Sequence, residues 1–141
     1  MTKAKTSNLT RSEIMRAVKS KDTAPEIVVR KLTHSLGFRY RLHRADLPGK
    51  PDLVFPTRRK VVFVHGCFWH GHICKRGARP PRQNAAYWSA KIARNVDRDA
   101  RNQIELHNSG WDVFIVWECE TKAGDRATLA TRLDKFLTRP G

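Results

Sequence analysis

The chain has 141 residues, of which 40% are hydrophobic and 29% charged, and its four tryptophans argue against a disordered polymer and for one folded domain. Its 28 Lys and Arg against 13 Asp and Glu give a formal net charge of +15. No run approaches the roughly 18 apolar residues of a membrane span, no signal peptide opens the sequence, and three cysteines do not suit a disulfide framework, so we expect a soluble cytoplasmic protein without membrane contact.

The first elements in chain order are helical. We expect a flexible N-terminus over residues 1–9, followed by a single domain over residues 10–141. A short helix is predicted from about Ser12 to Val18. A second begins at Thr23, where Thr-Ala-Pro-Glu fits a capping box, and runs to Leu36, with Gly37 as its stop.

The middle of the chain reads as β-structure. Residues 38–42 alternate apolar and basic side chains, as a strand half exposed to DNA would, and residues 47–51 form a turn. Residues 52–55 and 60–65 are predicted to form a hairpin. The second of these strands is apolar on both faces, which is typical of a central strand.

A long helix, a strand and a final helix complete the pattern. The helix spans about Ala86 to Asn108, with a stripe at helical spacing that comprises Trp88, Ile92, Val96, Ala100, Ile104 and His107. A strand over residues 113–117 and an amphipathic helix over residues 126–137 follow. A hairpin, a crossover helix and another strand predict an α/β fold with a mixed central sheet flanked by helices.

The positive charge is unevenly distributed along the chain. Residues 1–51 carry 12 basic and 4 acidic side chains, residues 52–96 carry 9 and 1, and residues 97–141 carry 7 and 8. This asymmetry predicts a positive face that binds a nucleic-acid backbone. The alternatives are a basic solvated surface and a ribosome-associated protein that coats RNA. Asp52 is the only carboxylate within residues 47–96, so it is either a stray surface residue or the ligand of a cation.

The cysteines and histidines indicate a zinc site. Cys67, His72 and Cys74 follow one predicted central strand, and Cys119 follows another. Four such ligands satisfy tetrahedral Zn²⁺. His70 could replace His72 as a ligand, and three ordinary buried cysteines with an exposed loop histidine remain the alternative.

Asp52 and His65 indicate metal-dependent phosphodiester chemistry. The hairpin can bring the Asp52 carboxylate beside the His65 imidazole, and a carboxylate together with the Val64 backbone carbonyl would suit Mg²⁺. His70 could then accept a proton from the attacking water, or His65 could assist at the leaving oxygen. The alternative is an aspartate that only stabilises a turn.

Several long motifs resemble the very-short-patch repair (Vsr) DNA mismatch endonucleases. They are Arg11–Ala17, Asp22–Glu26, Leu47–Asp52, Val61–Cys74, Lys91–Asp99 and Val116–Cys119. The resemblance covers about residues 10–137. It implies a restriction-endonuclease-like core of the PD-(D/E)xK type, a structural zinc, and Mg²⁺-dependent nicking beside T·G mismatches left when 5-methylcytosine deaminates. It also implies a functional link to a cytosine methyltransferase.

The resemblance assigns roles by position. Asp52 corresponds to the metal-binding aspartate, and His65 and His70 to the catalytic histidines. The zinc ligands correspond to Cys67, His72, Cys74 and Cys119. Glu26 matches an acidic residue near the active site, although a capping-box glutamate is an equal alternative.

Three further residues, Met15, Phe68 and Trp69, match side chains that wedge into the base stack, and the alternative for the two aromatics is burial in the core. Wedging costs least at a mismatched step, so it can favour mismatches.

We therefore expect a monomeric, nucleoid-associated endonuclease that acts on double-stranded DNA with a T·G mismatch. One alternative is a zinc-stabilised DNA-binding module without catalysis. The other is a related nuclease with a different DNA target.

Overall fold

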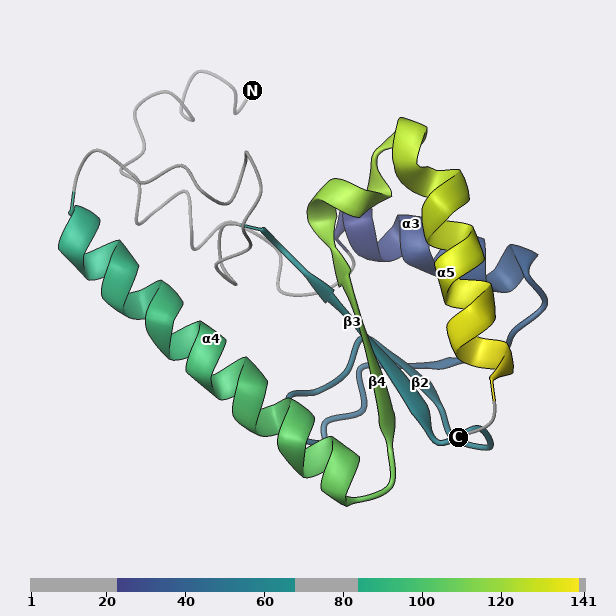
Figure 1. Cartoon of the computed structure of the whole chain (residues 1–141), viewed down its shortest axis with the longest axis horizontal. Coiled ribbons are helices and arrows are strands. Elements are labelled where there is room, and N and C mark those ends of the chain that lie inside the picture. Colours follow the sequence, from purple (N-terminus) through teal and green to yellow (C-terminus); the bar gives the residue numbers. More distant parts are fainter. Residues whose placement is uncertain (1–22, 68–83, 140–141) are drawn as a thin grey trace, which may run out of the picture.

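The fold is built on a mixed four-stranded sheet (Figure 1). The computed structural model describes residues 23–67 and 84–139. In this part the strands are β1 (Arg41–Leu42), β2 (Leu53–Phe55), β3 (Lys60–His65) and β4 (Asp112–Trp117), in the spatial order β1-β2-β3-β4. The first three are antiparallel neighbours, and β4 pairs parallel to β3. The predicted mixed α/β sheet is confirmed.

Helices cover both faces of this sheet. They are α3 (Ala24–Ser35), α4 (Ala85–Asn108) and α5 (Arg126–Thr138), with two short 3-10 turns, η1 (Glu118–Thr121) and η2 (Ala123–Asp125), between β4 and α5. Figure 1 shows α4 on one side of the strands and α3 with α5 on the other. None of the helices in residues 23–67 and 84–139 has the length and apolar character that a membrane crossing needs.

Alternation along the strands divides the core into two layers. The layer against α3 and α5 includes Leu53, Phe55, Val62 and Val116 together with Val29, Leu129, Leu133, Phe136 and Leu137. The layer against α4 comprises Val54, Val61 and Phe63 with Leu106 and Trp111. Because β3 supplies side chains to both layers, its prediction as a central strand is confirmed.

The link from α3 to β1 shortens the predicted strand over residues 38–42 to two residues. Gly37 has a φ of 91°, and the N–H groups of Gly37 and Phe38 donate to His34 and Thr33 carbonyls at 3.0 and 3.2 Å. This Schellman motif uses the Phe38 N–H at the helix end instead of in the sheet. Phe38 then enters the core, where it is 8% exposed.

The apolar stripe predicted for α4 is buried at Trp88 but is exposed further along the helix. Val96 is 43% and Ile104 60% exposed, whereas Trp88 and Leu106 are buried. The side of α4 between those two buried residues includes partly buried polar groups, among them Asn95 and Asp99. Amphipathic analysis places polar residues in solvent, so it cannot identify a buried helix face that contains polar groups.

The basic turn between β2 and β3 caps two helices at the end of the sheet away from Asp52. Lys60 Nζ donates to the Phe136 and Arg139 carbonyls at 2.5 Å, and Arg58 Nη1 donates to Leu137 at 3.0 Å. Arg59 Nη2 donates to the Ser109 carbonyl at 2.8 Å, just beyond α4. Part of the excess positive charge therefore neutralises helix C-termini instead of facing a partner.

Replacing Lys60 should destabilise the fold. Lys60 is 1% exposed, and burial lowers its pKa, but its ammonium satisfies two carbonyls at the end of α5. We expect Lys60→Met to lower the free energy of unfolding by about 1–3 kcal/mol, measured by urea denaturation. The exposed Lys135→Met on the same helix is the control and should change it by less than about 0.5 kcal/mol. Equal stability of the two variants would contradict the capping role.

Candidate functional site

A tight turn leads the chain into the site. The Lys50 N–H donates to the Leu47 carbonyl at 3.1 Å, with Pro48 and Gly49 at the centre of the turn and a φ of 77° at Gly49. Proline followed by a residue of positive φ is the pattern of a type II turn. A Cβ on Gly49 would lie 3.1 Å from the Phe63 ring, so the turn also needs glycine for its close approach to β3.

Asp52 is anchored to β3 by its backbone and its side chain. Its N–H donates to the Val62 carbonyl at 3.0 Å, and its Oδ2 accepts from the Val64 N–H at 2.6 Å. The side chain is 16% exposed. Asp52 is therefore not a stray surface residue, and its carboxylate is bound across the hairpin to the residue that precedes His65.

Glu26 of α3 fits both roles that the sequence left open, a helix-capping residue and an acidic residue of the site. Its N–H approaches Thr23 Oγ1 at 3.5 Å, and the Thr23 hydroxyl donates to Glu26 Oε2 at 3.2 Å, as expected near a helix start. The other oxygen, Oε1, lies 3.4 Å from His43 Nε2. Glu26 therefore contributes to the helix cap with one oxygen and faces the site with the other, although its side chain is only 4% exposed.

His43 lies between the two carboxylates. The register Leu42↔Leu53 brings the residue after β1 opposite Asp52, and the His43 N–H donates to the Asp52 carbonyl at 3.3 Å. His43 Nδ1 is 3.8 Å from Asp52 Oδ1. One ligand atom each from Glu26, His43 and Asp52 lies within 4.8 Å of the others, a spacing that a divalent cation could close.

The pKa of Asp52 is raised to about 7, mainly because the carboxyl is buried and secondarily because Glu26 is near, while the hydrogen bond from the Val64 N–H and the charge of Arg30 act against the rise. Two carboxylates are thus held close together where water screens them poorly. A divalent cation would stabilise the charged form of Asp52, so the residues present fit a metal of the Mg²⁺ class.

His65 ends β3 and turns toward α4. Its Nδ1 lies 4.0 Å from Asp99 Oδ2. Its ring contacts Phe63 in a tilted arrangement and Trp117 edge to face, at centroid distances of 5.6 and 5.3 Å. The His65 side chain is 7% exposed. The two aromatic rings fix the imidazole plane, and Asp99 provides a carboxylate beside one of its nitrogens.

Two of the expected zinc ligands follow the ends of neighbouring parallel strands. The parallel register ends with His65↔Trp117, and Cys67 and Cys119 each follow two residues later. The Cys67 N–H donates to Glu118 Oε1 at 3.4 Å, which ties the two segments together beyond the strands. Cys67 is buried and Cys119 is partly buried. Two thiols at adjacent strand ends suit half of a tetrahedral site.

Six predicted site residues lie outside the described part of the chain. They are Met15, Phe68, Trp69, His70, His72 and Cys74. The expected N-terminal segment over residues 1–9 and the helix from Ser12 to Val18 lie outside it as well.

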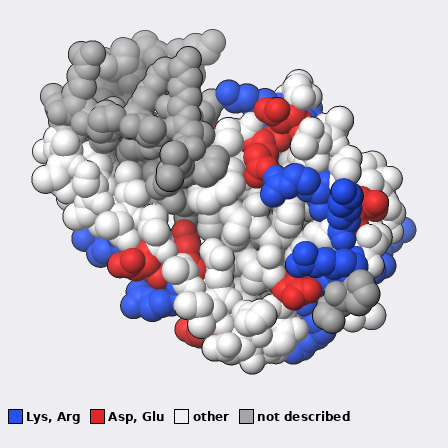
Figure 2. Space-filling view, in the orientation of Figure 1, with Lys and Arg blue, Asp and Glu red and all other residues white. Residues whose placement is uncertain are grey.

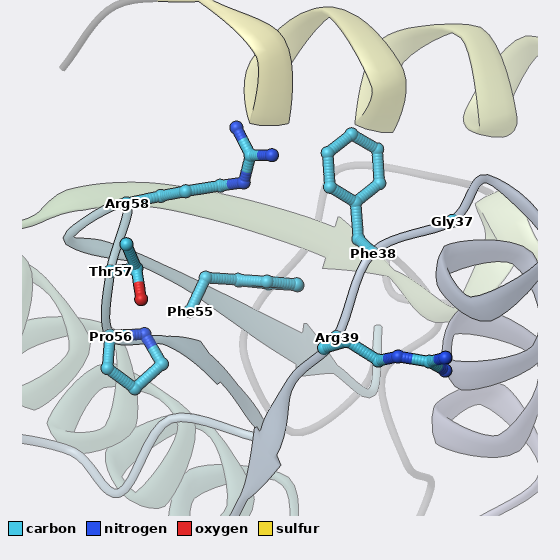
Figure 3. Close-up of a pocket in the computed structure, with 7 residues that line it drawn as sticks. All are labelled: Gly37, Phe38, Arg39, Phe55, Pro56, Thr57 and Arg58. Carbon is cyan, nitrogen blue, oxygen red and sulfur yellow. The ribbon is translucent and has the colours of Figure 1, made fainter.

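Two hollows flank the described sheet. One of about 740 Å³ is lined by Tyr40, Arg41, Leu42 and Arg44 and so adjoins His43. The other, of about 460 Å³, lies at the β2–β3 turn, where Figure 3 shows Phe38 and Arg58 pointing toward α5. Because Arg58 stacks over Phe38 and caps α5, this second hollow has a structural explanation.

The surface charge is mixed on the face drawn in Figure 2, where Lys and Arg lie interspersed with Asp and Glu. The described residues on this side of the molecule therefore do not form the positive face that the charge asymmetry predicts. Two arginines that line the larger hollow, Arg41 and Arg44, flank Leu42 and His43 in sequence.

Comparison with known proteins decides the family. A profile described as "DNA mismatch endonuclease Vsr" matches residues 4–76. The chain belongs to the Vsr family of DNA mismatch endonucleases. It is 52% identical to the type II nicking enzyme V.XorIIP of Xanthomonas oryzae pv. oryzae, over 90% of this chain and 91% of the relative. It is 40% identical to the DNA mismatch endonuclease Vsr of Escherichia coli, over 94% of this chain and 86% of the relative.

Membership of the Vsr family makes the chain an endonuclease that acts on DNA. The alternative of a DNA-binding module without catalysis is thereby set aside. The resemblance stated from the motifs is confirmed.

Three site residues were missed by the sequence analysis. Arg30 and His43 lie between Glu26 and Asp52, and Asp99 lies beside His65. The signals were present: Arg30 lies one helical turn after Glu26, and pairing the strand before His43 with the one after Asp52 would have placed the imidazole. Asp99 lay within a matching motif but received no role.

Proposed function

We propose that this Vsr family member nicks one DNA strand beside T·G mismatches that arise from 5-methylcytosine deamination, in an Mg²⁺-dependent reaction that starts very-short-patch repair. The main support for the proposal is that Asp52 lies near Glu26 and is hydrogen-bonded to the Val64 backbone, close to the end of β3. The sheet with its β2–β3 hairpin and crossover helix α4 is assigned to a restriction-endonuclease-like core of the PD-(D/E)xK type.

Asp52 and the Val64 backbone carbonyl would hold Mg²⁺, with Glu26 facing the same space. When bound, Mg²⁺ supplies Lewis-acid stabilisation of the charge that develops on the phosphate and lowers the pKa of a bound water. The buried carboxylates would hold the cation where the dielectric constant is low, so its electrostatic effect on the phosphate would be strong. Asp52 is kept in position by the 2.6 Å hydrogen bond from Val64.

The histidines carry the proposed proton transfers. His65 assists at the leaving oxygen, and Asp99 would hold its imidazole in one tautomer from the opposite nitrogen. His70 takes the proton from the attacking water. Phe63 and Trp117 keep water away from the sides of the His65 ring and restrict its rotation.

A structural Zn²⁺ is proposed on Cys67, His72, Cys74 and Cys119. The parallel register of β3 and β4 supports it, because it brings Cys67 and Cys119 to equivalent positions beyond the strands. The ion would tie the segment after β3 to the segment after β4. Phe68 and Trp69 follow Cys67 directly, so zinc would also stiffen the segment that carries these two proposed wedge residues, which act with Met15.

The proposed partner is a mismatched DNA duplex. Arg41 and Arg44, beside the hollow next to His43, are suited to contact phosphates near the scissile bond. We further propose that the enzyme acts as a monomer in the cytoplasm, associated with the nucleoid, and is functionally linked to a cytosine-5 methyltransferase.

Duplexes that carry T·G or C·G at one position test this function. With Mg²⁺ at one salt concentration, we expect a single nick beside the T·G mismatch and intact matched duplex. The strand and position of the nick are read on a denaturing gel. Cleavage of both duplexes at equal rates would overturn the mismatch specificity and favour a nuclease with a different target.

A further inference from the structure

A chain of four side chains connects α3 to Asp52. Arg30 Nη2 lies 3.2 Å from Glu26 Oε1, one turn earlier on α3, and 3.1 Å from His43 Nε2. On the other side of the ring, His43 Nδ1 lies 3.8 Å from Asp52 Oδ1. Glu26 Oε1 also lies 3.4 Å from His43 Nε2, so Glu26, Arg30 and His43 contact one another and His43 continues to Asp52 Oδ1.

The Arg30 contact selects one form of the His43 ring. A guanidinium can only donate hydrogen bonds, so the Arg30 contact at 3.1 Å favours a lone pair on Nε2. Glu26 Oε1 lies farther from the same nitrogen, at 3.4 Å, and already accepts from Arg30. The ring proton then sits on Nδ1 and points toward Asp52 Oδ1. The tautomer with its proton on Nε2 would set that N–H against the Arg30 guanidinium.

His43 is also held by its backbone in a conformation that few residues adopt. Its φ is 47°, which is uncommon outside glycine, asparagine, aspartate and histidine. The β1–β2 pairing and the hydrogen bond from its N–H to the Asp52 carbonyl maintain it. Such outliers persist where the surrounding structure determines them, and they cluster at functional sites.

We propose that Arg30 and His43 are positioning residues of the metal centre: Arg30 fixes the tautomer of His43, and His43 orients the Asp52 carboxylate. This rests on the proposed function of Asp52. The two carboxylate oxygens then have separate partners, because Oδ2 accepts from Val64 and Oδ1 faces the His43 Nδ1–H. A carboxylate that is hydrogen-bonded at Oδ2 and attracted at Oδ1 by an N–H 3.8 Å away loses less freedom when it binds a cation.

The first test compares two replacements of His43. Glutamine can accept from Arg30 with its carbonyl and donate to Asp52 with its amide, whereas leucine of similar size can do neither. We expect His43→Leu to slow T·G nicking by about 10–100-fold and to raise the Mg²⁺ concentration for half-maximal rate, with an unchanged KM for the duplex. His43→Gln should retain most of the rate and the wild-type pH profile.

The second test measures which nitrogen of the His43 ring carries the proton, and it does not depend on enzyme activity. In ¹⁵N spectra of the imidazoles at about pH 8, where an ordinary imidazole is neutral, His43 should carry its proton on Nδ1. Arg30→Met should shift it toward the Nε2–H form. The exposed pair Arg39 and His34, whose Nη1 and Nε2 lie 3.2 Å apart, offers the control: Arg39→Met should leave His43 and the nicking rate unchanged.

Each outcome decides between these roles. A proton on Nε2 of His43 in the wild type would overturn the proposal, as would full activity of His43→Leu with unaltered Mg²⁺ dependence. If His43→Gln and His43→Leu lose equal nicking activity while thermal unfolding shows that both are folded, the proposal is overturned. A ring nitrogen that ligates metal or transfers a proton would then explain the result. A wild type that fails to nick T·G duplexes would remove the proposed function, and the ¹⁵N spectra would still decide the positioning role.

Discussion

Asp52→Asn should reduce nicking by at least about 10³-fold, the factor that corresponds to several kcal/mol of transition-state stabilisation by a bound cation. Asparagine keeps the size of the side chain and can still accept from the Val64 N–H, so the hairpin geometry is preserved. What it removes is the negative charge opposite Glu26. Binding of the mismatched duplex should be unchanged or tighter, because one charge that repels phosphates is gone.

The same substitution should stabilise the metal-free protein. The pKa of Asp52 is about 7 in the folded state against an ordinary value of 3.8, so the folded state binds the proton more tightly than the unfolded state. Stability is therefore lost as pH rises between these values. We expect Asp52→Asn to raise the free energy of unfolding by on the order of 2–4 kcal/mol above about pH 7, and by little below about pH 4.

Asp134→Asn is the matched control for both measurements. Asp134 is an exposed carboxylate on α5, which carries none of the candidate site residues, so its removal should affect neither nicking nor the pH dependence of stability. Gel assays of single turnover and urea denaturation at several pH values supply the readouts. Robust nicking by Asp52→Asn would exclude the metal assignment, and equal pH profiles of the two variants would exclude a buried, charged Asp52.

The sequence predicted the parts of the site that depend on local pattern. The β2–β3 hairpin, the central position of β3 and the parallel strand β4 follow from apolar runs and turn residues. They bring Asp52 to Val64, and they place Cys67 and Cys119 beyond the ends of neighbouring strands. The burial of Leu129, Leu133, Phe136 and Leu137 on α5 was also predicted from helical spacing and is confirmed.

The sequence did not predict contacts that break those patterns. His43 follows a strand of only two residues and has a positive φ, so no strand pattern marks it as part of the site. Asp99 lies on a helix face where polar groups turn inward, which amphipathic analysis reads as solvent. Both residues belong to the candidate site, and functional sites are where a chain is expected to depart from local sequence preferences.

Cys119→Ser should abolish zinc binding and leave a protein that unfolds readily. Structural Zn²⁺ contributes folding free energy directly, about 10–16 kcal/mol in small zinc-dependent peptides, because the site does not exist in the unfolded chain. Here the ion would join two segments that the sheet holds in register only up to His65↔Trp117. Beyond that pair, the described connection includes one 3.4 Å hydrogen bond from Cys67 to Glu118, too weak to replace a metal.

Metal content and stability should therefore fall together in this variant. Elemental analysis of the wild type should give about one Zn²⁺ per chain, and a chelator should reproduce the destabilisation seen in Cys119→Ser. Lys122→Ser, an exposed position three residues further along, is the control and should keep both the metal and the stability. A serine replaces a partly buried thiol at small cost when no metal is involved, so a Cys119→Ser protein as stable as Lys122→Ser, with or without chelator, would rule out a structural zinc at these strand ends.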